Sequence, residues 1–307
     1  MAITIYPITA QFAAEIGDVD LAHPLDADDV AAIKQAFWDY AVVIFPEQNL
    51  TQEQHVAFAK YIGPIEPTIG AYRPDSKLRL PPELVDISNL NVRNEIWGEK
   101  SRLRGLQLGN RLWHTDSSFK YLPARASLLY ARTIAPVGGH TEFADLRAAY
   151  DALDDSLKRK LPGLIAIHAL AYSRQRTGFS NFSESERKEL PPVPQVMVRT
   201  IPENGCKSLY IASHIGRIIG MPDDEALALV DQLIAHATQR QFVYTHRWRL
   251  HDLVMWDDRC TMHRGTEYDD LRWTRDMHRA TVSDIANTCE QEGVAIPGES
   301  QHSREQQ

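Results

Sequence analysis

The chain has 307 residues, of which 43% are hydrophobic and 24% are charged, and it carries a net charge of −8. This is the composition of an ordinary globular protein, and the length allows a hydrophobic core without disulfides. The acidic charge argues against a nucleic-acid partner, which usually requires a basic face. The cysteines form no CxxC pair, no Lys or Arg precedes Lys34, and no apolar run approaches the roughly 18 residues that cross a bilayer. We therefore expect a cytoplasmic protein that contacts no membrane.

The N-terminal region predicts a strand, a helix, a buried strand and a second helix. A weakly alternating segment at 3–8 precedes an amphipathic pattern at 27–41, whose first turn is acidic. The run AVVIF at 41–45 is continuously apolar, which is typical of a buried strand. Thr51 and Gln54 then have the spacing of a capping box, so the second helix begins there.

Residues 64–112 are rich in Pro, Arg and Asn, and only LVDIS at 84–88 resembles a strand. We expect a long, partly irregular segment. Long loops in compact domains are usually functional or mobile, so we expect residues 66–109 to influence the choice of substrate.

Strands dominate from residue 126 onward, with helices inserted between them. Strand-like segments lie at 126–134, 196–200, 208–212, 241–246, 252–257 and 278–284, and helical segments begin near 145, 154, 183 and 222. Strand and helix do not alternate regularly, which disfavours a parallel α/β sheet. The sequence therefore predicts a mainly β fold, a double-stranded β-helix (a cupin-like jelly roll) with flanking α-helices. We expect one domain over residues 1–286 and a disordered polar tail over residues 287–307.

The segment NRLWHTDSSF contains His114 and Asp116, separated by one residue. On an extended strand both side chains point to the same face. An imidazole and a carboxylate there can supply two ligands of the 2-His-1-carboxylate iron site. The pair alone is a weak signal, because a polar strand end has the same pattern.

A third histidine and two arginines follow near the C-terminus. His263 comes after an apolar strand and a turn, where a β-sandwich can bring it to a distant ligand pair, although an isolated histidine is more often a core residue. Arg275 and Arg279 are four residues apart, so on a strand they share a face. Their planar guanidinium groups suit carboxylates. The alternative interpretation is an exposed edge strand whose charges prevent aggregation.

Four segments occur in a characteristic order: NRLWHTD, PVGGHTEFADLRAAYDAL, WDDRCTMHRG and RDMHRAT. In this order they resemble the taurine and 2,4-dichlorophenoxyacetate dioxygenase family (TauD/TfdA). The resemblance extends over nearly the whole chain, to about Asp284, and is greatest to members that act on 2,4-dichlorophenoxyacetate. Four ordered motifs are far more specific than any one of them.

This resemblance implies an oxidoreductase that uses Fe(II), 2-oxoglutarate and O2. His114, Asp116 and His263 would be the iron ligands and the catalytic centre. Thr141 and Arg275 would bind the far carboxylate of 2-oxoglutarate. Succinate and CO2 would be the co-products.

The resemblance also implies a small anionic aromatic substrate. Arg279, His214 and Asn110 would contact it. Hydroxylation of an aryloxyalkanoate such as 2,4-dichlorophenoxyacetate next to its ether oxygen would give a phenol and glyoxylate. One position departs from the family pattern, because Asp258 stands where relatives usually have asparagine. Both residues are tolerated in turns.

Other functions stay open at this point. The same chemistry could act on a sulfonate, a sulfate ester or another small carboxylate, and a non-catalytic jelly-roll module could keep the metal site. A hydrolase or a Rossmann oxidoreductase is disfavoured, because the chain contains neither G-x-S-x-G nor G-x-G-x-x-G. A homo-oligomer is also open, since no apolar stripe identifies an interface.

Overall fold

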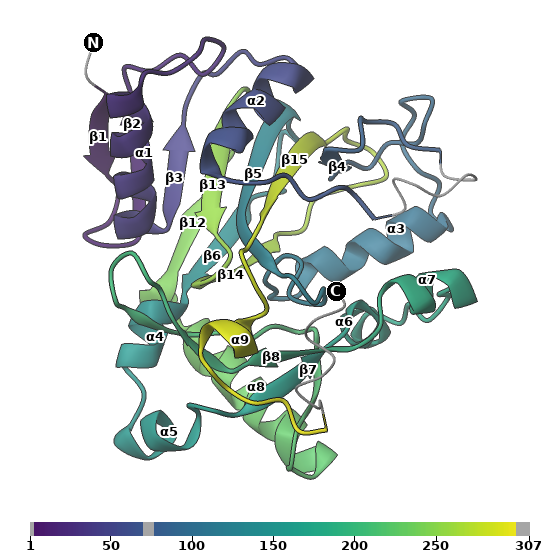
Figure 1. Cartoon of the computed structure of the whole chain (residues 1–307). Coiled ribbons are helices and arrows are strands. Elements are labelled where there is room, and N and C mark those ends of the chain that lie inside the picture. The colour runs from purple at the N-terminus through teal and green to yellow at the C-terminus, as the bar shows by residue number, and fades with distance from the viewer. Residues whose placement is uncertain (1–2, 70–76, 299–307) are drawn as a thin grey trace.

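Two β-sheets form the centre of the computed structural model, which describes residues 3–69 and 77–298 (Figure 1). The larger sheet has the order β1-β2-β3-β13-β5-β15-β4 and the smaller sheet the order β12-β6-β14. The strands of the larger sheet are β1 (Thr4–Pro7), β2 (Ala13–Gly17), β3 (Val42–Phe45), β13 (Leu253–Asp257), β5 (Ala124–Thr133), β15 (Asp276–Ser283) and β4 (Leu84–Asp86). Those of the smaller sheet are β12 (Val243–His246), β6 (Thr141–Asp145) and β14 (Thr261–Gly265). Neighbouring strands in these sheets are antiparallel except β2 and β3.

The two sheets face each other across a shared hydrophobic core. Phe143 of β6 packs with Trp256 and Val254 of β13 and with Leu129 of β5, all buried. The ring centroids of Phe143 and Trp256 lie 5.3 Å apart. This is the sandwich arrangement of the expected jelly roll.

Two helices cover the outer face of the larger sheet (Figure 1). These are α1 (Ala27–Tyr40) and α2 (Gln52–Ile62), as the sequence predicts. Thr51 forms the expected capping box with Gln54 at the start of α2. Phe37 and Phe58 are buried in the cluster between the helices and the sheet.

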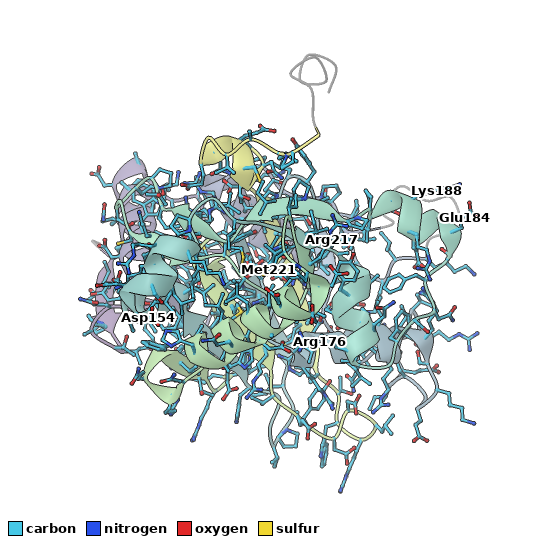
Figure 2. The ribbon with its side chains drawn as sticks, turned by 90° about the horizontal axis from the view of Figure 1, so that it is seen from below. Asp154, Arg176, Glu184, Lys188, Arg217 and Met221 are labelled. Carbon is cyan, nitrogen blue, oxygen red and sulfur yellow. The ribbon has the colours of Figure 1, made fainter. Side chains whose placement is uncertain are left out.

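The outer face of the smaller sheet packs against α4, α8 and two minor sheets. The elements on this side are α4 (Leu146–Asp151), α5 (Asp155–Lys160), β7 (Ile165–His168), β8 (Val193–Val196), β9 (Val198–Thr200), β10 (Lys207–Leu209), β11 (Ile215–Ile218), α8 (Asp223–Ala237) and η2 (Arg240–Phe242). Leu229 and Leu233 of α8 and Met262 of β14 are buried together. Figure 2 shows this side of the molecule, where Arg176 pairs with Asp231 of α8 at 2.7 Å.

Short helices border the open end of the sandwich. They are α3 (Arg102–Gln107), η1 (Leu108–Arg111), α6 (Leu170–Arg176) and α7 (Glu184–Glu189). Helix α6 contacts η1. The predicted irregular segment thus contains β4, α3 and η1 within its described part, and residues 70–76 of it lie outside the described residues.

Several elements were not predicted from the sequence, namely β2, β6, β7, β11, β14, α3 and α6, and the predicted tail also differs. Strand β2 was not predicted, since AAEIG has no clear strand pattern, and it forms by pairing with β1 and β3. The predicted disordered tail is wrong for residues 287–298, because Asn287 caps a short helix, α9 (Thr288–Gln291), and donates to the carbonyls of Tyr121 and Pro194. Residues 299–307 lie outside the described residues. Among the described helices, none has both the length and the apolar character needed to span a membrane.

Candidate active site

Three buried residues, His114, Asp116 and His263, bring potential metal-binding atoms together. His263 lies in β14 and forms an isolated antiparallel bridge with His114, with backbone hydrogen bonds of 3.0 and 2.8 Å. Nε2 of His114 lies 3.9 Å from Asp116 Oδ1, and Nε2 of His263 lies 3.7 Å from Asp116 Oδ2. One ligand atom of each residue lies within 4.8 Å of the others. We call these residues the triad.

Both triad histidines are neutral at neutral pH. Burial lowers the pKa of His114 to about 4 and lowers the pKa of His263 well below its usual value. Nδ1 of His114 donates to the Leu112 carbonyl at 2.7 Å, because a carbonyl can only accept. Nε2 of His114 therefore keeps its lone pair for a metal.

Asp116 is an ionised carboxylate. Burial opposes its charge, but the Arg279 guanidinium, followed by the hydrogen bond from Ser127, outweighs burial and lowers the pKa of Asp116 to about 2. Arg279 Nη1 donates to Oδ1, and Ser127 Oγ donates to Oδ2 at 2.9 Å. Arg279, which the family resemblance assigns to the substrate, is thus engaged with a triad residue.

Asp258 holds the backbone of Asp116 through a hydrogen bond. Its Oδ1 accepts from the backbone N–H of Asp116 at 3.2 Å and from Trp256 Nε1 at 3.0 Å. Burial, followed by the charge of Asp116, raises the pKa of Asp258 well above its usual value. The neutral acid still offers the acceptor oxygen that an asparagine would offer here.

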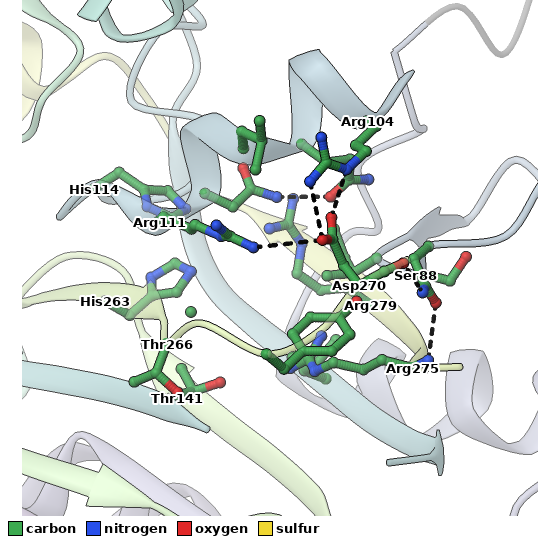
Figure 3. A pocket seen from close by; sticks show the side chains of 18 of the residues that line it. Ser88, Arg104, Arg111, His114, Thr141, His263, Thr266, Asp270, Arg275 and Arg279 are labelled. Carbon is green, nitrogen blue, oxygen red and sulfur yellow. Dashed lines mark hydrogen bonds and ion pairs between the residues drawn. The ribbon is translucent and has the colours of Figure 1, made fainter. Parts of the chain in front are cut away.

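A cavity of about 100 Å³, the smaller cavity, adjoins the triad (Figure 3). His114 and His263 line it together with Thr141 and Arg275. The Arg275 guanidinium is buried, and its Nε donates to the Gly139 carbonyl at 3.2 Å. Within residues 3–69 and 77–298, it forms no salt bridge to a carboxylate. The cavity therefore presents an uncompensated positive charge.

Thr141 adds a hydrogen-bond donor to the same cavity. Trp248 Nε1 donates to Thr141 Oγ1 at 3.0 Å, so the hydroxyl hydrogen is available to another acceptor. The preceding turn needs glycine: Gly138 has φ 74°, and a Cβ there would lie 2.2 Å from the Glu267 carbonyl oxygen. This turn brings the Gly139 carbonyl to Arg275.

A second cavity of about 540 Å³, the larger cavity, also reaches the triad. His114, Asp116 and Arg279 line it. Much of its remaining wall is apolar and comes from α3, α6, α7 and nearby loops, with Leu103, Leu106, Phe119, Leu170, Phe182 and Leu190. A hydrophobic wall beside polar groups suits an aromatic molecule with a polar end.

The remaining predicted residues, Asn110 and His214, line this larger cavity. Asn110 also borders the smaller cavity. Nδ1 of His214 lies 2.9 Å from Ser173 Oγ, and its Nε2 is buried without a hydrogen-bond partner among the described residues. A further cation, Arg174, lines the same cavity and was not predicted. The sequence YSRQR around it matches no motif, so only its position in the fold identifies it.

The donor set fits a non-haem iron ion. Two neutral imidazoles and one carboxylate approach a common point, as in the 2-His-1-carboxylate site, and leave other positions open. The smaller cavity fits a dicarboxylate, since Arg275 and Thr141 can bind one end while the triad lies at the other border.

Comparison with known proteins identifies a family that agrees with this site. A family model described as "Taurine catabolism dioxygenase TauD, TfdA family" matches residues 4–281. The chain belongs to the TauD/TfdA family. The resemblance predicted from four ordered motifs is confirmed, and the chain is an oxidoreductase of the dioxygenase type.

Curated TauD/TfdA relatives cover almost the whole chain. An alpha-ketoglutarate-dependent 2,4-dichlorophenoxyacetate dioxygenase of Cupriavidus pinatubonensis is 41% identical over 287 residues, which are 93% of this chain and 99% of the relative. An (S)-phenoxypropionate/alpha-ketoglutarate-dioxygenase of Sphingobium herbicidovorans is 37% identical over 279 residues, which are 87% of this chain and 91% of the relative.

Solved structures confirm the predicted fold class. The crystal structure of AAD-2 in complex with Mn(II) and N-oxalylglycine has a TM-score of 0.85 and 43% sequence identity, and covers 94% of this chain and 99% of that one. A taurine dioxygenase from Burkholderia xenovorans has a TM-score of 0.74 at 30% identity, and covers 93% of this chain and 91% of that one.

Proposed function

We propose that this TauD/TfdA-family chain is an Fe(II)- and 2-oxoglutarate-dependent dioxygenase that hydroxylates an aryloxyalkanoate, such as 2,4-dichlorophenoxyacetate, next to the ether oxygen. The hydroxylated aryloxyacetate is a hemiacetal, which breaks down into a phenol and glyoxylate. 2-Oxoglutarate and O2 yield succinate and CO2. The observation that carries the proposal is the buried triad beside a cavity lined by Arg275, a cation that forms no salt bridge with a described carboxylate. The names of two relatives, at 41% and 37% identity, support the substrate class.

The triad residues His114, Asp116 and His263 would hold the iron. When bound, Fe(II) supplies the activation of O2 that is coupled to oxidative decarboxylation of 2-oxoglutarate. The protein contributes neutral imidazoles and a carboxylate whose low pKa keeps it ionised. No proton has to leave these groups at neutral pH before the metal binds.

Arg275 and Thr141 would bind the far carboxylate of 2-oxoglutarate. The guanidinium is already positioned by the Gly139 carbonyl, and the Thr141 hydroxyl by Trp248. A charged and a neutral donor can then meet the two carboxylate oxygens. Because both groups are buried, water does not compete strongly for the anion.

The aryloxyalkanoate would occupy the larger cavity. Its ring would contact apolar residues such as Phe119 and Leu170, while its carboxylate lies toward the polar end near His214, Asn110 and Arg279. This orientation puts the carbon between the ether oxygen and the carboxylate beside the triad, which is the position that reacts.

The test is anaerobic reconstitution of the purified chain with Fe(II) and 2-oxoglutarate, followed by O2 and a panel of phenoxyacetates, phenoxypropionates, alkyl sulfonates and sulfate esters. We expect succinate formation that depends on the aryloxyalkanoates, with phenol and glyoxylate in equal amounts from phenoxyacetates. Succinate that appears only with sulfonates or sulfate esters would contradict the substrate class. The His263→Ala variant should lose both iron binding and turnover, and normal turnover in it would remove His263 from the iron site.

Two expectations stay predictions. A cytoplasmic location agrees with the cysteine pattern, since Cys206, Cys260 and Cys289 are odd in number, widely spaced and form no CxxC pair. A homo-oligomer can be tested by light scattering of the purified chain.

A further inference from the structure

Arg174 of α6 is a buried cation in the wall of the larger cavity. The residue is 7% exposed. Within the described ranges 3–69 and 77–298, it makes no salt bridge. Burial lowers the pKa of Arg174 to about 10, so the group stays positively charged at neutral pH. A buried, uncompensated charge is costly, and such a charge in a cavity indicates that an anion binds there.

Neutral groups hold the Arg174 guanidinium in place. Nη2 donates to Asn110 Oδ1 at 2.9 Å, and Asn110 Nδ2 in turn donates to Gln107 Oε1 at 2.9 Å. Gly109 leaves the room that the side chain occupies, since a Cβ there would lie 2.4 Å from Arg174 Cδ and 2.5 Å from Nε. Asn110 and Gly109 therefore fix the position of the Arg174 guanidinium without neutralising its charge.

The same cation is linked to His214 through one hydroxyl. Ser173 Oγ accepts from Arg174 Nη1 at 3.1 Å and lies 2.9 Å from His214 Nδ1. The Ser173 hydroxyl donates its one hydrogen to the Leu170 carbonyl at 3.0 Å, so it accepts from His214 Nδ1–H, and His214 Nε2 is buried without a partner among the described residues. Arg174 is therefore the hydrogen-bond donor to an anion here, and the neutral His214 ring lies beside it.

The location of Arg174 suits the reaction. The rings of His214 and the triad residue His114 are centred 5.9 Å apart, in an edge-to-face arrangement. An anion bound by Arg174 beside His214 would therefore lie near the triad. An aryloxyalkanoate is oxidised on the carbon attached to its carboxylate, so its carboxylate must be held at such a distance.

Several other charged groups around the larger cavity already have partners of opposite charge. These pairs are Arg279 with Asp116, Arg102 with Glu186 at 2.7 Å, Lys120 with Glu66 at 2.6 Å, and Arg79 with Asp86 at 2.7 Å. Arg279 in particular contacts the ionised triad carboxylate directly. An incoming carboxylate would compete with Asp116 for Arg279, whereas Arg174 forms no salt bridge with a described carboxylate and interacts with Asp116 only at longer range.

We propose that Arg174, oriented by Asn110 and Ser173 and lying beside His214, binds the carboxylate of the substrate and makes the enzyme select acids over neutral analogues. This inference rests on the proposed function, whose substrate class it sharpens, and it assigns the head-group contact to a cation of α6 rather than to Arg279.

The test compares phenoxyacetate with phenoxyacetamide, which has the same shape and no charge. For wild type and Arg174→Met, kcat/KM is measured with each substrate at saturating Fe(II) and 2-oxoglutarate. We expect Arg174→Met to lower the ratio of kcat/KM for the acid to kcat/KM for the amide by about 10- to 100-fold, which corresponds to loss of a charge-assisted hydrogen bond. Arg174→Lys, which keeps the charge and loses the planar fork, should recover part of the ratio. An unchanged ratio, or an equal loss for both substrates, would overturn the proposal.

A control and a second variant separate charge recognition from damage to the fold. Arg176→Met removes an arginine of the same helix that pairs with Asp231 on the surface, and it should leave the ratio within about twofold of wild type. A changed ratio in this variant would count against Arg174 as the specific cause. Gly109→Ala keeps the Arg174 charge and displaces its guanidinium, so the ratio should fall in the same direction. If the ratio is unchanged in Gly109→Ala, Arg174 is not the contact.

A binding measurement distinguishes failure of this inference from failure of the proposed function. Equilibrium dialysis of phenoxyacetate against the anaerobic Fe(II)–2-oxoglutarate enzyme needs no turnover. The Kd of phenoxyacetate should rise by about 10- to 100-fold in Arg174→Met, while the Kd of 2-oxoglutarate stays within about twofold. If Arg174→Met binds phenoxyacetate more weakly but the wild type never oxidises it, the carboxylate site is supported and the proposed reaction is refuted. If the wild type oxidises phenoxyacetate and its Kd is unchanged in Arg174→Met, the reaction is supported and the carboxylate site is refuted.

Discussion

Asp258 shows how a buried carboxyl group can replace an amide next to an ionised one. Its Oδ1 accepts two hydrogen bonds, while its Oδ2 is buried and lacks a partner among the described residues. Burial and Asp116 raise its pKa, so folding keeps Asp258 protonated at a pH at which the unfolded chain ionises it. Its contribution to stability is therefore complete at low pH and is lost as the pH rises.

Asp258→Asn should raise the free energy of unfolding of the metal-free protein, and by more at pH 8 than at pH 5. Asparagine keeps the acceptor oxygen and has no proton to lose, so the penalty at high pH disappears. Urea denaturation of both proteins at the two pH values measures the effect. An equal change in the free energy of unfolding at both pH values would show that Asp258 is not held as a neutral acid.

Arg275→Met should weaken 2-oxoglutarate binding by about 10- to 100-fold, because a charge-assisted hydrogen bond to the far carboxylate is lost. The iron affinity should change little, since Arg275 contacts no triad side chain directly in the hydrogen bonds that it forms. Anaerobic equilibrium dialysis of 2-oxoglutarate measures the change, with the exposed Arg217→Met on β11 as the matched control. Unchanged 2-oxoglutarate affinity would exclude Arg275 as its anchor.

At the scale of residues, the sequence predicts the triad, whereas Arg174 is identified only by the tertiary structure. The spacing of His114 and Asp116 and the order of the motifs are local or ordered patterns, and the structure groups these residues with His263. Arg174 was not predicted because the residue that orients its guanidinium, Asn110, lies 64 residues away in the chain. No spacing rule connects such partners before the chain has folded.

Among the elements, α3 and η1 border both cavities and are tied to the β14–β15 connection. Arg104 of α3 donates to Asp270 from Nε at 2.8 Å and from Nη2 at 3.0 Å (Figure 3). Both side chains are largely buried, so this bidentate pair is worth more than a surface salt bridge.

Arg104→Gln should loosen this segment and raise the KM for 2-oxoglutarate roughly fivefold, which is about 1 kcal/mol for the lost pair. Amide hydrogen exchange should become faster at residues 102–111 and stay unchanged in α8. Arg176→Gln, which removes a surface pair with Asp231, is the control. Unchanged exchange at 102–111 would show that other contacts hold the segment closed.

Elements with strong local signals were predicted and elements without them were not. Acidic first turns and the Thr51 capping box identified α1 and α2, because those signals lie within a few residues. Strand β2 needed its partners β1 and β3, and α9 needed the contact of Thr288 Oγ1 with Gln195 Oε1 at 2.6 Å. The polar composition of residues 287–298 predicts disorder, because the sequence does not show the surface against which this segment packs.

The whole molecule should become less stable in acid because it buries neutral histidines. Burial lowers the pKa of His55 to about 3 and that of His168 also to about 3. Below about pH 6.5 the unfolded chain binds protons that the folded chain does not, so the free energy of unfolding falls as the pH decreases.

His55→Gln should reduce this loss by about 2 kcal/mol between pH 7.5 and pH 5.0, which is the linkage of one such histidine. Glutamine can keep the donor that meets the Leu128 carbonyl, now 3.1 Å from His55 Nε2. Urea midpoints at the two pH values measure it, and His23→Gln, at an exposed position, is the control. An identical loss in wild type and His55→Gln would refute the assignment.

Local patterns in the sequence were sufficient for the family, the mainly β fold and the residues of the triad, since each depends on motifs of a few residues in a fixed order. Tertiary structure decided how the charges are used. It paired Arg279 with Asp116, left Arg275 and Arg174 without a salt bridge to any described carboxylate, and placed each in the wall of a cavity. Charge compensation depends on distances between residues that are far apart in the chain, and only folding sets those distances.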